Sequence, residues 1–167
     1  KLEGSKYAYA LSCGMACLDV IMRLVRPGEC VIAGDDLYGG SNRLLELLKK
    51  QMHIEVDNID TTDLVAVEQA LQQRAKAHAA GEGARVALVL LESPTNPMIK
   101  IADLAGCTRL VRKYIPEALV VVDNTMLSPY LMRPLEFGVD IVYHSATKYL
   151  SGHHDIMAGV ISCNRDD

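Results

Sequence analysis

Short apolar runs alternate with longer amphipathic segments along most of the chain. Runs rich in Val, Ile and Leu predict strands over residues 29–34, 54–59, 84–92, 118–123, 139–145 and 158–163. Apolar residues three and four apart predict helices from about residue 15 and over 40–51, 62–80 and 101–115, with Thr62 capping the third. Because strands that are apolar throughout are buried on both faces, we expect an α/β domain: a mainly parallel sheet flanked by helices.

Polar clusters follow four of the predicted strands. They are "DDLYGG" after 29–34, "ESPTNP" after 84–91, "DNTMLSP" after 118–122 and "SATK" after 139–144. Ligands of open α/β sheets bind at the carboxyl ends of the strands. The convergence of four clusters on that edge therefore predicts a ligand site there.

Composition narrows the class of protein. The 167 residues suit one domain, half of them are hydrophobic, and the net charge of −4 is scattered, which argues against nucleic acid as a partner. The apolar runs are too short to span a membrane, and we expect no leader segment. Five cysteines without a CxxC pair favour reduced thiols and a cytoplasmic location. His153 and His154 are adjacent and make a poor chelate, so we expect no metal.

Three residues are candidates for binding a ligand, each with a plainer alternative. Gly14 precedes an amphipathic run, and free N–H groups at a helix start bind phosphate, although any helix begins this way. Tyr38, beside two glycines, could stack on a flat ligand or simply pack in its loop. Asn96, between two prolines, could bind a ring oxygen or only form a turn.

Asp123 and Lys148 are the candidates for chemistry. Asp123 ends a buried strand, where it could cap a helix, form a turn with Asn124 or keep a cationic ring nitrogen protonated. Lys148 lies beyond the next strand among hydroxyls, including those of Ser145 and Thr147. An unprotonated amine attacks a carbonyl, and neighbouring hydroxyls can bind a phosphate. A solvated surface lysine is the alternative. Jointly, the candidates at this edge describe a pocket for pyridoxal phosphate (PLP).

These motifs resemble one family over nearly the whole chain. "SCGMA", "GDDLYGGSNRLL", "ESPTNP" and the segment from "VVVDNTMLSP" through "HSATKYLSGHHDIMAGV" are similar to the Cys/Met-metabolism branch of PLP-dependent enzymes. The resemblance implies the large, PLP-binding domain of a fold-type I enzyme, similar to aspartate aminotransferase. It implies that residues 1–167 form this domain, without an N-terminal arm and a C-terminal domain.

The resemblance also implies roles for individual residues. Lys148 would hold PLP as a Schiff base and then move the substrate's Cα proton, with help from Tyr38 stacked on the ring. Asp123 would pair with the pyridine nitrogen. The other implied cofactor-binding residues are Gly14, Met15, Ser145 and Thr147 at the phosphate, Asn96 at the phenolic oxygen and Thr125 near the ring.

The implied activity is carbon–sulfur bond cleavage in a sulfur amino acid. The segment "IMAGV" resembles the corresponding segment of the branch members that split cystathionine by β-elimination into homocysteine, pyruvate and ammonia. γ-Elimination, γ-replacement and methionine γ-lyase activity stay open, as does a catalytically silent subunit that binds PLP. A nucleotide-binding α/β domain is a further alternative, but it would need a GxGxxG loop after its first strand, and the chain contains none.

The chain departs from the family pattern in three ways. Cys13 stands where the family often has serine, so one hydroxyl near the phosphate is missing. The family's Tyr-x-Arg pair, lent by a neighbouring subunit, and the arginine that grips the substrate carboxylate are both absent from these residues. The resemblance implies a homotetramer built as a dimer of dimers. Because the Tyr-x-Arg pair and this arginine are missing, we expect residues 1–167 to be inactive in isolation.

Overall fold

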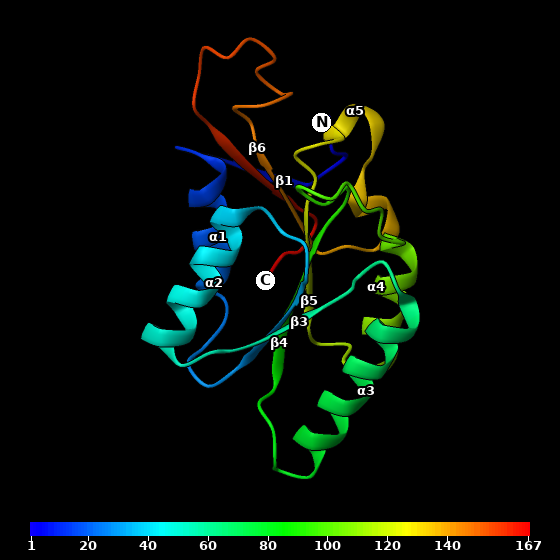
Figure 1. Cartoon of the computed structure of the whole chain (residues 1–167). Helices are drawn as coiled ribbons and strands as arrows, with labels where there is room; N and C mark the ends of the chain where they lie inside the picture. Colours follow the sequence, from blue (N-terminus) through cyan, green and yellow to red (C-terminus); the bar gives the residue numbers. More distant parts are fainter.

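The computed structural model describes residues 1–167 and contains one seven-stranded sheet between two layers of helices (Figure 1). The strands are β1 (Tyr7–Leu11), β2 (Cys30–Gly34), β3 (Glu55–Ile59), β4 (Val86–Glu92), β5 (Leu119–Asp123), β6 (Ile141–Ser145) and β7 (Gly159–Cys163). Their order is β1-β7-β6-β5-β4-β2-β3; β7 pairs antiparallel with both β1 and β6, and all other pairs are parallel. The predicted mainly parallel α/β sheet is confirmed.

Helices cover both faces of the sheet. In Figure 1, α1 (Gly14–Met22) and α2 (Gly39–Met52) lie on one side of the sheet, and α3 (Leu64–Ala79) and α4 (Leu104–Tyr114) lie on the other. A short α5 (Ser128–Leu131) and a 3₁₀ turn (Pro134–Phe137) lead from β5 to β6. None of the helices combines the length and apolar character needed to cross a membrane.

Each face of the sheet buries its own hydrophobic core, because successive strand residues point to opposite faces. In β4, Leu88 and Leu90 belong to the core under α1 and α2, whereas Val89 and Leu91 belong to the core under α3 and α4. The two cores contain 18 and 17 buried residues. The central strands are thus apolar on both sides, as the uninterrupted Val/Ile/Leu runs predict.

Two details differ from the expectations. The strand β1 was not predicted, because "YAYAL" contains no Val/Ile/Leu run, and four of its five residues are exposed. The helix α3 is capped by Asp63, which accepts from the N–H of Val65 at 2.8 Å, so the predicted Thr62 cap is wrong. The hydroxyl and N–H of Thr62 instead bind Asp60, because that carboxylate closes a turn just before the helix.

Candidate active site

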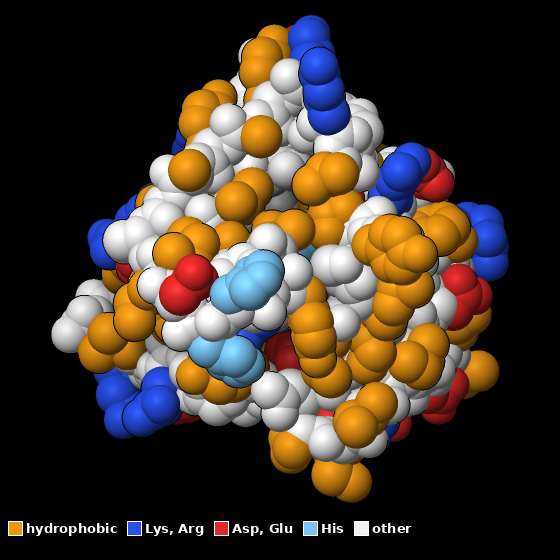
Figure 2. Space-filling model, turned by 90° about the horizontal axis from the view of Figure 1, so that it is seen from above, with side chains coloured by type: hydrophobic (Ala, Val, Ile, Leu, Met, Phe, Trp, Pro, Cys, Tyr) orange, Lys and Arg blue, Asp and Glu red, His pale blue; other side chains and the backbone are white.

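A cavity of about 360 Å³ opens at the carboxyl ends of the parallel strands, on the side of the sheet covered by α1 and α2. Seen from this edge, the molecule has a hollow with acidic and basic side chains inside and hydrophobic side chains around it (Figure 2). The cavity is lined by Cys13, Gly14, Met15, Tyr38, Ser41, Glu92, Pro94, Asn96, Asp123, Thr125, Met126, Tyr143, Ser145, Thr147, Lys148 and Met157. All four predicted polar clusters, and every predicted site residue, therefore meet at one cavity.

The first turn of α1 forms one wall of the cavity. Cys13 is the N-cap, and its Sγ accepts from the N–H of Ala16 at 3.4 Å. The N–H groups of Gly14 and Met15, the first two residues of the helix, have no partner within it. A Cβ at Gly14 would come within 2.8 Å of the Cβ of Ser145, so glycine lets the helix start approach β6. This arrangement places free N–H donors beside the hydroxyl of Ser145.

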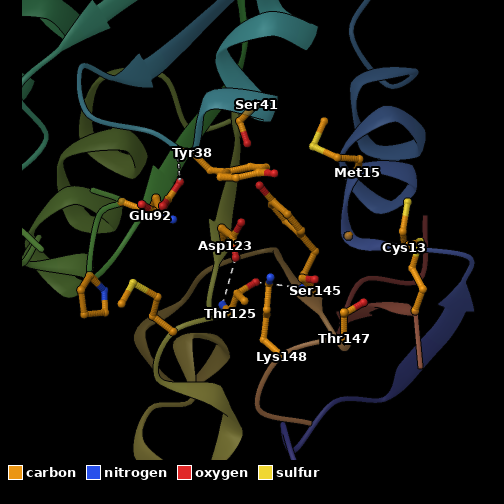
Figure 3. A pocket seen from close by; sticks show the side chains of 16 residues that line it. Cys13, Met15, Tyr38, Ser41, Glu92, Asp123, Thr125, Ser145, Thr147 and Lys148 are labelled. Atoms are coloured by element: carbon orange, nitrogen blue, oxygen red, sulfur yellow. Dashed lines mark hydrogen bonds between the residues drawn. The ribbon is translucent and has the colours of Figure 1, made fainter. Parts of the chain in front are cut away.

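Tyr38 lies on the opposite side of the cavity from Lys148, at the start of α2 (Figure 3). Its N–H donates to Glu92 Oε2 at 3.0 Å, which ties the start of α2 to the end of β4. A Cβ at Gly40 would come within 2.5 Å of Cε1 in the Tyr38 ring and 2.8 Å of Met15 Sδ. Glycine at position 40 therefore makes room for the Tyr38 ring at the cavity wall.

Lys148 follows β6 in a tight turn, in which its N–H donates to the carbonyl of Ser145 at 3.1 Å. Its side chain is exposed and reaches into the cavity on the side of Asp123 and Thr125 (Figure 3). Thr125 Oγ1 accepts from the N–H of Ser145 at 2.8 Å, which links the turn after β5 to the end of β6. The amine is accessible and faces the carboxyl of the neighbouring strand.

The hydroxyl of Thr147 is already engaged by the chain. It accepts from the N–H of Ala158 at 3.0 Å and lies 3.3 Å from the carbonyl oxygen of the same residue. These contacts close the loop between β6 and β7. A hydroxyl has a single proton, so Thr147 can donate to a ligand only by turning away from that carbonyl.

Asp123 and Glu92 bring two carboxyls to the cavity from adjacent strands. Asp123 Oδ1 accepts from the N–H of Thr125 at 2.9 Å, so the predicted turn is present and the carboxyl also borders the cavity. Although the Asp123 residue is partly open to the cavity, burial of its carboxyl raises its pKa. Burial raises the pKa of Glu92 to about 8, and the nearby Asp123 carboxyl adds to the rise. No lysine or arginine pairs with either carboxyl, so the site carries acid groups that a cationic ligand would stabilise.

Asn96 lies on the loop after β4, and its side chain is exposed at the rim of the cavity. Sequence reasoning missed three polar lining residues, which are Ser41, Glu92 and Tyr143. Glu92 ends an apolar strand as Asp123 does, so the same signal could have identified it. Tyr143 and Ser41 sit inside predicted strand and helix segments and carry no such signal. No group of His, Cys, Asp and Glu is placed to hold a metal ion.

Comparison with known proteins identifies the family. The model of the family described as "Cys/Met metabolism PLP-dependent enzyme" matches residues 1–167. The chain belongs to this family. It is 50% identical over 167 residues to a cystathionine beta-lyase of Schizosaccharomyces pombe, covering 100% of the chain and 40% of that relative. It is 50% identical over 164 residues to a cystathionine beta-lyase of Neurospora crassa, covering 98% of the chain and 34% of that relative.

The chain is also similar to a solved structure of a related enzyme. Cystathionine gamma-lyase from Lactobacillus plantarum, complexed with L-serine, superposes with a TM-score of 0.87 at 35% identity, over 98% of the chain and 40% of that protein. The family uses PLP, and its solved members have the fold described above. The chain spans about 40% of the length of these relatives or less.

Proposed function

We propose that this chain carries most of the PLP site of a carbon–sulfur lyase that splits cystathionine by β-elimination into homocysteine, pyruvate and ammonia. The observation that carries the proposal is the placement of an accessible amine, Lys148, a buried acid, Asp123, and an aromatic ring, Tyr38, around one cavity. The cystathionine beta-lyases that are 50% identical to the chain support this substrate and reaction.

The lining residues fit PLP in charge and in shape. When bound, PLP supplies an aldehyde carbon and a cationic ring that withdraws electrons from an attached amino acid. The unpaired carboxyl of Asp123 would bind the protonated ring nitrogen and gain the cation that it lacks within the chain. Tyr38 would stack on the ring, and Asn96 and Thr125 would approach its edge. Glu92 would hold Tyr38 in place through the Tyr38 N–H.

The phosphate would lie at the first turn of α1. Gly14 and Met15 would donate their N–H groups, and the positive end of the helix would favour the anion. Ser145, whose Cβ lies against Gly14, would add its hydroxyl. Thr147 would add a second hydroxyl only after its proton turns away from the carbonyl of Ala158.

Lys148 would have two tasks at the cavity. Its Nζ would hold PLP covalently at rest. Once the substrate amine has displaced it, the free Nζ would remove the proton from the substrate Cα. The exposed position of Lys148 allows this exchange, because Nζ can move between two partners without breaking an ion pair. Tyr38, across the cavity, would assist the movement of protons.

The cavity holds a single basic side chain, Lys148, and no arginine. A substrate carboxylate and a phosphate together need more positive charge than this. We propose that residues outside positions 1–167 and a neighbouring subunit supply it, within a homotetramer in the cytoplasm. Residues 1–167 would then be most of the cofactor domain and would be inactive in isolation.

Lys148→Ala in the full-length protein tests the assignment. The wild-type protein should retain PLP covalently after borohydride reduction, with the label on the peptide that contains Lys148. The variant should lose the label, and kcat should fall by roughly 10³-fold or more. Lys49→Ala, which changes an exposed lysine of α2, is the matched control and should behave as wild type. A label on another lysine would refute the role of Lys148.

Product analysis tests the reaction. Cystathionine should yield pyruvate if the bond to the β-carbon breaks and 2-oxobutyrate if the bond to the γ-carbon breaks. The gamma-lyase among the similar structures makes the second outcome the alternative. A protein that binds PLP through Lys148 but releases neither product would be the silent subunit.

A further inference from the structure

Three polar side chains form a row across adjacent parallel strands at the cavity floor. Glu92 of β4 is in register with Asp123 of β5, and Asp123 is in register with Tyr143 of β6. Residues in register on parallel strands project to the same face of the sheet. All three side chains line the cavity, so Asp123 lies between an acid and a phenol.

Tyr143 is deeply buried, with 3% of its surface exposed, yet it carries a hydroxyl. Asp123, its partner in register on β5, and Ser41 on α2 line the same cavity as Tyr143. Burial raises the pKa of Tyr143 well above its ordinary value, and hydrogen bonds with Asp123 and Ser41 also act on it. Ser41 is itself only 2% exposed. A buried hydroxyl is unfavourable without a partner, so these two contacts account for its presence.

Packing alone does not require the hydroxyl. Tyr143 belongs to the hydrophobic core under α1 and α2, and its partner in register on β7 is the apolar Ile161. A phenylalanine would fill the same space in the core. Tyr143 differs from phenylalanine in carrying a hydrogen-bond donor on the face of the sheet that also carries Asp123.

The other ionisable groups around Asp123 give it little positive compensation. Burial raises the pKa of Glu92 on β4 and of Cys17 on α1, and the Asp123 carboxylate adds to both rises, so neither group supplies positive charge. His144 on β6 favours the negative charge of Asp123, and the amine of Lys148 reaches toward that carboxyl across the cavity. The hydroxyl of Tyr143 lowers the pKa of Asp123 against the effect of burial.

We propose that Tyr143 is a positioning residue for Asp123: its hydroxyl, anchored by Ser41, donates to the carboxylate and holds it ionised and aimed into the cavity. The inference rests on the proposed binding of PLP by Asp123. Tyr143 would act through Asp123 on the cofactor, and it would not contact the substrate. Its loss should therefore change kcat and the binding of PLP, but not KM.

Tyr143→Phe in the full-length holoenzyme tests this role. The dissociation constant of PLP should rise roughly tenfold, as expected for the loss of one hydrogen bond to a charged group. The pH profile of the absorbance of bound PLP should shift toward lower pH, because Asp123 without the phenol takes up a proton more readily and, once neutral, no longer stabilises the protonated ring nitrogen. The fall in kcat should exceed any change in KM. The thermal midpoint of the PLP-free protein separates these effects from a folding defect.

Ser41→Ala keeps the test decisive if Tyr143→Phe does not fold. It removes only the anchor of the Tyr143 hydroxyl and should shift PLP affinity and the pH profile in the same direction, by roughly threefold in affinity. Wild-type affinity and pH profile in Tyr143→Phe, or in Ser41→Ala if only that variant folds, would overturn the inference. If borohydride still fixes PLP to Lys148 in that case, the proposed function stands and only the role of Tyr143 fails.

Discussion

Polar residues at the carboxyl ends of β5 and β6 lie on both faces of the sheet, and their surroundings differ between the two faces. On one face, Asp123 and Tyr143 line an open cavity. On the opposite face, the next residue of each segment, Asn124 and His144, is buried and contacts Glu3 of the N-terminal segment. His144 Nε2 pairs with Glu3 Oε1 at 2.5 Å, and Asn124 Nδ2 donates to the carbonyl of Met132 at 2.8 Å.

The difference separates a structural polar cluster from a functional one. Glu3, Asn124 and His144 are at most 4% exposed and hydrogen-bond to one another, although Glu3 Oε2, Asn124 Oδ1 and His144 Nδ1 have no partner. They fix the N-terminal segment to the sheet. Asp123 instead keeps an acid with a raised pKa at the edge of a cavity, without a basic partner. A folded chain retains such a group where a ligand supplies the missing charge.

Asp123→Asn should produce the largest functional effect. The amide cannot hold the ring nitrogen of PLP protonated, so kcat/KM of the full-length enzyme should fall by roughly 10³-fold. The PLP-free protein should keep its thermal midpoint, because burial already disfavours the ionised carboxyl. The matched control on the opposite face, Asn124→Ala, should lower the midpoint. Equal loss of stability in both variants would erase the proposed distinction.

Glu3→Ala should produce the largest loss of stability. It leaves His144 and Asn124 buried without their shared partner, and a buried polar group that loses its hydrogen bond costs about 1–3 kcal/mol. Urea unfolding of the PLP-free protein measures this loss. PLP affinity of the folded fraction should stay near wild type. Glu3→Gln, which keeps an acceptor oxygen, should lose less, and an equal loss would argue against the hydrogen bonds as the cause.

Glu92→Gln should change how stability depends on pH. The pKa of Glu92 is about 8 in the folded protein against 4.5 as its ordinary value. Between these pH values the folded state holds a proton that the unfolded state has released, so stability falls as pH rises, by up to about 1.4 kcal/mol per pH unit. Glutamine should flatten this slope in the PLP-free protein.

The control for this prediction is Glu46→Gln, which changes an exposed glutamate on α2. Urea unfolding at pH 5, 6.5 and 8 compares the three proteins, and the control should retain the wild-type slope. An unchanged slope in Glu92→Gln would mean that Glu92 is not the buried acid that the geometry indicates.

Cys13→Ser should give the smallest effect. Oxygen accepts the N–H of Ala16 better than the sulfur does at 3.4 Å, so the cap of α1 should gain about 0.5 kcal/mol. PLP should bind up to roughly threefold more tightly if the new hydroxyl also reaches the phosphate. Cys17→Ser, four residues on and fully buried, should instead destabilise the protein. Weaker PLP binding in Cys13→Ser would place the phosphate elsewhere.

The sequence by itself determined the parts of this protein that depend on neighbours along the chain. The Val/Ile/Leu runs required strands buried on both faces, and the polar clusters beyond them marked the ligand edge. That pattern, with the family motifs, led to the cavity residues from Gly14 to Lys148. The roles of these residues toward PLP remain predictions.

Only the tertiary structure decided which strands pair and in what register. The alignment of Glu92, Asp123 and Tyr143 depends on the offsets of three strands, and a shift of one residue would send a side chain to the other face. The pairing of Glu3 with His144 joins residues 141 positions apart. Periodicity along a chain records which face is buried, whereas register and distant contacts are set by the packing of the whole domain.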